Sequence, residues 1–137
     1  MNNIIENFKA VYQGLDASNI SLVKTIYADD IVFVDPFNEV RGLPALVEYF
    51  SKLYRNLDSC NFEFLKVYAN STSAMLTWNM EFSHQAFRNR TVEVPGSTEI
   101  HFDEKINFHR DYFDAGKMIY ENIPVLGSAI RYIKRQV

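Results

Sequence analysis

The segment from Ile26 to Phe50 constrains the fold more than any other part of the chain. It runs from the end of a helical pattern into a strand, a turn and a further helix, and its residues 31–34 are β-branched or aromatic, as in a half-buried strand. Asp35-Pro36 ends this strand, because proline cannot donate to a ladder and keeps the preceding residue extended. The Asp35 carboxylate is therefore expected at the mouth of a strand with a fixed direction, as a structural group or a chemical one.

The rest of the chain divides into helical and strand patterns. Helical spacing predicts a helix at 3–15 and a short second helix that begins after Ser18 and ends at residues 27–30. It also predicts a long helix after Pro44 and a last helix that begins at Pro124. Alternation then predicts strands at 62–68, 76–84, 91–102 with a bulge or bend at Pro95-Gly96, and 106–114. Three helices followed by a four-stranded meander, together with the early strand, indicate an α+β fold whose curved sheet wraps over the helices.

A chain of 137 residues is long enough for one domain with its own core, so we expect a single domain over 1–137. Its last part, about 115–137, is expected to be a helical tail. An apolar stripe predicts that the tail packs onto the domain, and the stripe consists of Leu126, Ala129, Ile130, Ile133 and Val137.

Charge and cysteine content argue against several function classes. A net charge of −3 disfavours a nucleic-acid partner, which would need a basic face. Cys60 is the only cysteine, so neither an intramolecular disulfide nor a zinc site with several thiolates can form. Three histidines on separate strands do not make a metal motif, and nothing predicts a cofactor. The chain has no signal-peptide pattern and no apolar run of membrane-spanning length, so we expect a cytoplasmic protein.

The motifs in this order resemble the nuclear-transport-factor-two-like superfamily, and most of all its SnoaL-like branch. They are Tyr-Ala-Asp-Asp at 27–30, the strand ending in Asp35-Pro36, a glycine before the long helix, and the closing strand His-Arg-Asp-Tyr-Phe-Asp at 109–114. The resemblance implies a cone-shaped fold. This fold carries ketosteroid isomerases, polyketide cyclases, epoxide hydrolases, dehydratases and binding modules without chemistry.

The resemblance also places residues in roles. Asp35 corresponds to the proton-shuttling aspartate of the isomerases, and Asp111 resembles the general base of the cyclases. The isomerases' oxyanion-hole tyrosine falls at Val11, with Tyr12 expected to face elsewhere, and their second oxyanion-hole acid falls near Thr98. Without acidic donors at these two positions a dienolate is not stabilised, which argues against steroid isomerisation.

The last strand carries the strongest candidate site. The resemblance turns its odd-numbered residues into the cone, which puts His109 and Asp111 side by side, as an imidazole oriented by a carboxylate for proton transfer or as a structural pair. Asp35 could face the same cavity, whose predicted wall consists of Leu76, Trp78, Met80, Tyr49 and Phe113. The opposite face is too apolar for water and predicts a homodimer through the outer face of the sheet, formed by Ile106, Phe108 and Tyr112.

These observations predict a small hydrophobic ligand, with a carbonyl-bearing molecule as one candidate. One hypothesis is a cyclase or isomerase in which Asp111 or Asp35 removes a proton α to the carbonyl and His109 assists. The alternative is a binding or dimeric interaction module of the same fold that performs no chemistry.

Overall fold

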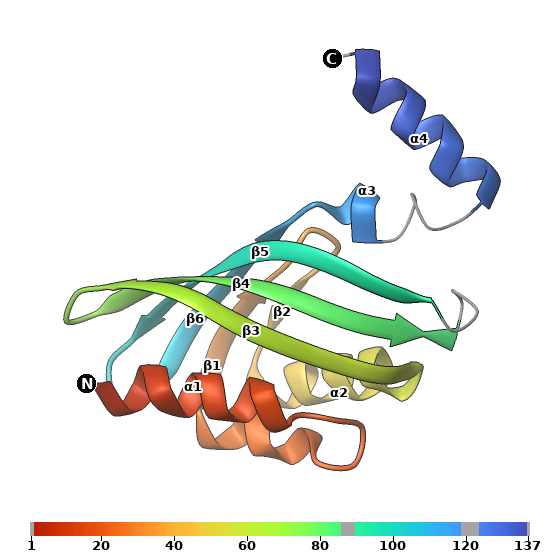
Figure 1. Cartoon of the computed structure of the whole chain (residues 1–137). Helices are drawn as coiled ribbons and strands as arrows, with labels where there is room; N and C mark the ends of the chain where they lie inside the picture. Colours follow the sequence, from red (N-terminus) through yellow and green to blue (C-terminus); the bar gives the residue numbers. More distant parts are fainter. Residues whose placement is uncertain (1, 86–89, 119–123, 137) are drawn as a thin grey trace.

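The computed structural model describes residues 2–85, 90–118 and 124–136, and within them it has an α+β fold (Figure 1). The helical elements are α1 (Asn2–Gly14), the 3-10 helix η1 (Ile20–Thr25), α2 (Leu43–Arg55), α3 (Ala115–Met118) and α4 (Pro124–Gln136). The strands are β1 (Tyr27–Val34), β2 (Glu39–Arg41), β3 (Leu57–Ala69), β4 (Ser73–His84), β5 (Thr91–Phe102) and β6 (Ile106–Phe113).

The strands form one curved sheet in the order β2-β1-β6-β5-β4-β3. Neighbouring strands are antiparallel except for β1 and β6, which run parallel. This pairing brings the first and last strands in chain order side by side. Residues 27–30, predicted to close a helix, instead begin β1, and β2 was not predicted because three residues are too few to show an alternating pattern. The sheet is therefore larger than expected, but the predicted fold class is confirmed.

Helices α1 and α2 cover the concave face of the sheet (Figure 1). The stripe on α1 buries Phe8, Val11 and Tyr12, as its helical spacing predicted, and Leu15, directly after the helix, is buried as well. Gly42 precedes α2 with a φ of 91°, a conformation that residues with a Cβ rarely adopt. Burial of a large apolar side chain stabilises the fold by about 1.5–3 kcal/mol, so these stripes fix how the helices sit against the sheet.

A bulge in β6 changes which side chains face inward. Phe102 pairs with Ile106, but His101 pairs with Phe108, so Asn107 is an extra residue opposite β5. Ile106 therefore lies on the same side as His109, and its side chain is 0% exposed. The prediction that Ile106 belongs to the outer face was wrong, since strict alternation does not hold across a bulge.

Helix α4 extends away from the sheet (Figure 1). Ile133 is 59% exposed, so the prediction that this side chain packs onto the domain was wrong; Val137 and the side chains of Leu126 and Ile130 lie outside the described residues. The Lys134 ammonium contacts the Asp114 carboxylate at 2.5 Å and lowers its pKa. No helix of the described chain is long and apolar enough to cross a membrane.

Candidate functional site

A pocket of about 670 Å³ is lined by residues of α2 and of the inner face of the sheet. About half of the lining residues are aromatic, and their rings include Phe33, Tyr49, Phe50, Phe62, Trp78 and Phe113. Met80 also lines the pocket, whereas Leu76 does not; Leu76 is fully buried in the main core between the sheet and the helices. Four of the five predicted wall residues therefore do lie on one pocket.

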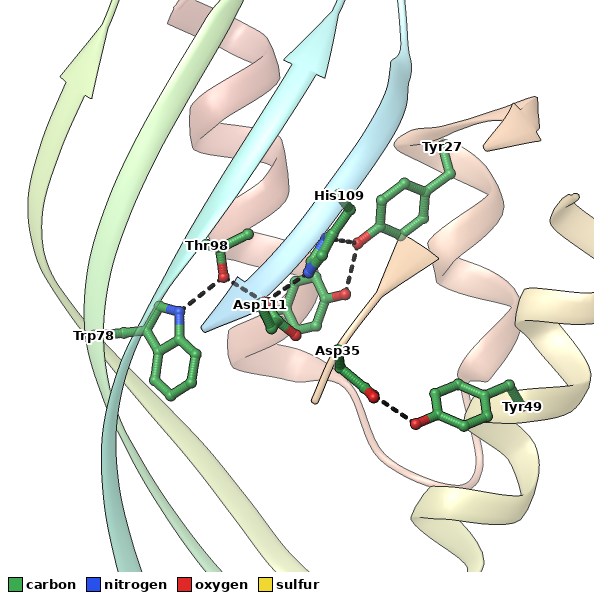
Figure 2. A network of polar contacts seen from close by, with 8 residues as sticks. Tyr27, Asp35, Tyr49, Trp78, Thr98, His109 and Asp111 are labelled. Carbon is green, nitrogen blue, oxygen red and sulfur yellow. Dashed lines mark hydrogen bonds and ion pairs between the residues drawn. The ribbon is translucent and has the colours of Figure 1, made fainter. Parts of the chain in front are cut away.

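The carboxylate of Asp111 lines this pocket. It belongs to a network of polar contacts (Figure 2). Its Oδ1 atom accepts a hydrogen bond from the Thr98 hydroxyl at 2.6 Å and contacts His109 Nε2 at 2.7 Å. The Thr98 hydroxyl in turn accepts a bond from the Trp78 indole N–H at 2.8 Å. The predicted contact between His109 and Asp111 is thus present, and Thr98, which is itself bound by Trp78, donates to the same carboxylate oxygen.

The hydrogen-bond chain continues inward from His109. Its Nδ1 atom lies 2.8 Å from the Tyr27 hydroxyl, which lies 2.6 Å from the Tyr12 hydroxyl. Tyr27 and His109 are 0% and 1% exposed, whereas Asp111 and Tyr12 both line the pocket. The chain therefore begins and ends at the pocket and passes through the interior between these ends.

Burial has a clear effect on the tyrosines of this chain. It raises the pKa of Tyr12 well above the ordinary value, and the nearby Tyr27 and Asp111 raise it further. Burial also raises the pKa of Tyr27 well above its ordinary value. Both hydroxyls therefore remain protonated at neutral pH and can act as hydrogen-bond donors.

The two oxygens of Asp111 are in different situations. Oδ1 faces two donors, while Oδ2 makes no hydrogen bond to any residue that the structure describes. The Asp111 side chain is 19% exposed and lines the pocket. A proton taken up from a molecule in the pocket would therefore reside on Oδ2, since Oδ1 is already occupied as an acceptor.

Asp35 lies on the same pocket but is bound differently. Its Oδ1 accepts the backbone N–H groups of Phe37 and Asn38, and its Oδ2 accepts the Tyr49 hydroxyl at 2.5 Å. Figure 2 shows this carboxylate turned toward α2 and away from His109. Asp35 therefore has the expected structural role, because it caps the turn after β1; it also lines the pocket, and a chemical role for it stays a prediction.

Sequence reasoning missed three members of the polar chain. Tyr12 was expected to face elsewhere, which was wrong, since its side chain is buried beside Tyr27 and lines the pocket. Tyr27 was assigned to a helix end, and Thr98 was considered only for an acid that it does not provide. One signal was available for Thr98: it is the polar residue on the β5 face that otherwise buries Val92, Val94 and Ile100.

Many solved structures share this fold, and three of them illustrate it. A putative SnoaL-like polyketide cyclase from Jannaschia sp. CCS1 has a TM-score of 0.72 at 11% identity, with 82% of this chain and 86% of that chain covered. An epoxide hydrolase of M. tuberculosis described as LEH-like has a TM-score of 0.71 at 16% identity, covering 95% and 93%. TerC, crystallised with polyporic acid, has a TM-score of 0.73 at 15% identity, covering 84% and 94%.

At these identities the likeness concerns the fold, which carries several different activities. A search of curated proteins found no match to the chain. The family model of the SnoaL-like domain matches residues 8–109, from α1 into β6. Since this match covers well over half of the chain, the protein belongs to the SnoaL-like domain family.

Proposed function

We propose that the pocket binds a small, largely apolar carbonyl compound and that Asp111 removes a proton from the carbon next to the carbonyl group. One observation carries the proposal: Asp111 lines an aromatic pocket with Oδ1 held by internal donors and Oδ2 without a described partner. A positioned carboxylate with one open oxygen is suited to accept a proton from a bound molecule. The aromatic wall would exclude water and hold an apolar substrate.

His109 and Thr98 serve as positioning residues in this reaction. Both bind Oδ1 and are almost completely buried, so they fix the direction of the carboxylate from the side opposite the substrate. A base held in this way loses little orientational freedom when the substrate binds. General-base catalysis by a positioned side chain typically contributes about 10²–10⁴-fold to the rate.

Removal of the proton leaves an enolate oxygen, which needs a hydrogen-bond donor. Tyr12 is the candidate, since its hydroxyl belongs to the polar chain and its side chain lines the pocket. In the orientation in which Tyr27 donates to Tyr12, Tyr12 does not use its own proton within the chain. The proton of Tyr12 is then free for the substrate oxygen.

Hydrogen exchange tests the proposal without knowledge of the natural substrate. Neopentyl phenyl ketone dissolved in heavy water should exchange its α-hydrogens faster in the presence of the protein, as followed by proton NMR. Asp111→Asn should remove most of this acceleration. Asp30→Asn is the matched control, because Asp30 is an exposed aspartate of β1 that does not line the pocket. Equal exchange rates for the wild type and Asp111→Asn would refute the assignment of the base.

A binding protein without catalysis is the second candidate. It is favoured by the internal pairing of the polar groups, since no buried side-chain nitrogen or oxygen of the described residues lacks a hydrogen-bond partner. Such a network can serve the fold alone. In that case the ketone binds the wild type and Asp111→Asn with similar affinity, and neither protein accelerates the exchange.

We also propose that two copies of the chain pair through the outer face of the sheet. With Ile106 in the core, this face retains Phe108, which is half-buried, and Tyr112, which is 40% exposed. Paired sheets would cover these rings. The single cysteine, Cys60, supports a reducing compartment such as the cytoplasm as the proposed location.

A further inference from the structure

Asp35 and Asp111 are neighbours across the junction of β1 and β6. In the parallel register Phe33 pairs with His109 and Val34 with Arg110, and the next residues along the two strands are Asp35 and Asp111. Adjacent strands lie about 4.8 Å apart, so the backbones bring two carboxylates to the same level of the pocket. Figure 2 shows both at this end of the strands.

Both carboxylates raise the pKa of Tyr49. Burial is the main cause that raises its pKa, the hydrogen bond to Asp35 is the next, and the charge of Asp111 adds a smaller contribution. The Tyr49 hydroxyl, on the α2 side of the pocket, donates a hydrogen bond to Asp35. A single position on the pocket wall therefore lies within the field of both acids.

No lysine or arginine of the described residues balances this pair, and His109 contacts Asp111 but not Asp35. Neither Asp35 nor Asp111 forms an ion pair with a lysine or arginine in the described part of the chain. Lys52 is the pocket-lining lysine, and its ammonium contacts Glu48 at 3.2 Å with most of the side chain exposed. Two partly buried carboxylates on an apolar wall repel each other, and a positive charge between them relieves this repulsion.

The wall around the two acids consists of aromatic rings. Phe33 and Tyr49 lie 5.9 Å apart between ring centroids, Phe37 and Phe113 also 5.9 Å, and Trp78 and Phe113 6.4 Å. Ring faces attract organic cations, and this attraction increases where water is excluded. Hard metal ions instead require a shell of six or more oxygens. The described residues contain no group of three or more side chains able to hold a metal ion.

We propose that the ligand of this pocket carries an ammonium group next to its carbonyl group, and that Asp35 recognises this positive charge while Asp111 faces the acidic carbon. The ligand class is an α-amino or α-ammonio carbonyl compound with an apolar remainder. Asp35 suits the role of a counter-ion because three hydrogen bonds already hold its oxygens in place. This inference rests on the proposed function for the existence of a carbonyl ligand and adds the charge that the ligand carries.

Two ketones of nearly the same shape test the charge. Phenacyltrimethylammonium carries a trimethylammonium group where neopentyl phenyl ketone carries a tert-butyl group. Trp78, the only tryptophan of the chain, lies on the pocket wall, so quenching of its fluorescence reports binding of either ketone. We expect the wild type to bind the ammonium ketone about tenfold more tightly than the neutral ketone, although the tert-butyl group is the more hydrophobic one.

Variants assign this preference to Asp35. Asp35→Asn keeps the size of the side chain and should lower the affinity for the ammonium ketone about tenfold relative to the affinity for the neutral ketone. Asp30→Asn removes the same charge from the exposed side of β1 and should change neither affinity. Tyr49→Phe keeps the Asp35 carboxylate, so it should retain the preference for the ammonium ketone even if Asp35→Asn perturbs the turn.

The outcomes separate this inference from the proposed function. If the neutral ketone binds as tightly as the ammonium ketone, or if Asp35→Asn leaves both affinities unchanged, the inference is overturned, whether or not Asp111 catalyses hydrogen exchange. If the ammonium ketone is preferred through Asp35 but no exchange occurs, the charge recognition stands and the catalytic proposal fails.

Discussion

The indole ring of Trp78 lies directly over Gly96 on the neighbouring strand, so closely that a Cβ atom at position 96 would clash with the ring. This approach sets the position of Trp78 in the pocket wall. It also places the indole N–H against the Thr98 hydroxyl. Gly96 thus helps to shape the pocket, since a larger residue at this position would push the indole ring away from β5.

Gly96→Ala should therefore displace Trp78. We expect a loss of about 1–3 kcal/mol in the free energy of unfolding, as is typical of overpacking, together with a change in tryptophan fluorescence. Urea unfolding measures the first effect. Gly14→Ala is the control: a Cβ at Gly14, the last residue of α1, meets no atom within 4 Å, so this variant should be at least as stable as the wild type. Similar stability of the two variants would contradict the role given to Gly96.

Thr98→Val tests the hydroxyl that links Trp78 to Asp111. Valine has nearly the same shape but can neither accept the indole N–H nor donate to the carboxylate, so two buried groups lose a partner. We expect the free energy of unfolding to fall by about 1–3 kcal/mol. Thr98→Ser should restore most of it, and Thr91→Val, at the exposed start of β5, should have little effect. No difference between Thr98→Val and Thr91→Val in urea unfolding would show that the hydroxyl is not needed.

The buried tyrosines predict a loss of stability in alkali. Burial raises the pKa values of Tyr12, Tyr27 and Tyr54 well above the value of about 10 that tyrosine has in an unfolded chain. Because the folded-state values are raised, this contribution to stability is fully present below about pH 10 and is lost as the pH rises further. Urea unfolding at increasing pH should show the decline, and tyrosinate absorbance should rise together with unfolding. Tyr54→Phe should reduce the slope, and an unchanged slope would argue against this explanation.

Much of the site followed from the alternation of single strands. The pattern in β4 placed Trp78 and Met80 on the inner face, and the pattern in β6 placed His109 beside Asp111. These predictions needed only a period of two and a known inward face. Ile106 was misplaced because a bulge interrupts that period, and the bulge depends on pairing with β5, which a single strand's sequence does not contain.

The rest of the site depends on contacts between distant segments. Tyr12 lies on the buried stripe of α1, but the fact that its hydroxyl meets Tyr27 depends on how the helix packs onto the sheet. A shift of one helical position turns a side chain by about 100°, which separates Val11 from Tyr12. The adjacency of Asp35 and Asp111 likewise follows from the parallel pairing of β1 with β6, two strands that are far apart in the chain.

The outer face of the sheet predicts a dimer that one charge should disrupt. Tyr112 is exposed there, with the Arg110 guanidinium 5.0 Å from its ring centre and its hydroxyl bonded to Glu99. Tyr112→Asp would place a negative charge beside Glu99 on each of two facing copies, which should shift a dimer to monomers. Light scattering after gel filtration measures the mass. The control is Leu22→Asp, at a similarly exposed apolar residue of η1, and this variant should remain dimeric. A monomeric wild-type protein would refute the proposed dimer.

Cys60 should be an unreactive thiol in the folded protein. It lines the pocket, and burial raises its pKa to about 12, so little thiolate exists near neutral pH. Compared with an ordinary cysteine, whose pKa is about 8.5, the thiolate fraction near neutral pH falls by roughly three thousandfold. Iodoacetamide should therefore alkylate the native protein at least about a hundredfold more slowly than the urea-unfolded protein, as mass spectrometry can follow.

Since the chain has a single cysteine, every adduct reports this site. Equal rates in both states would mean that Cys60 is open to solvent and that the wall of the pocket is not closed around it.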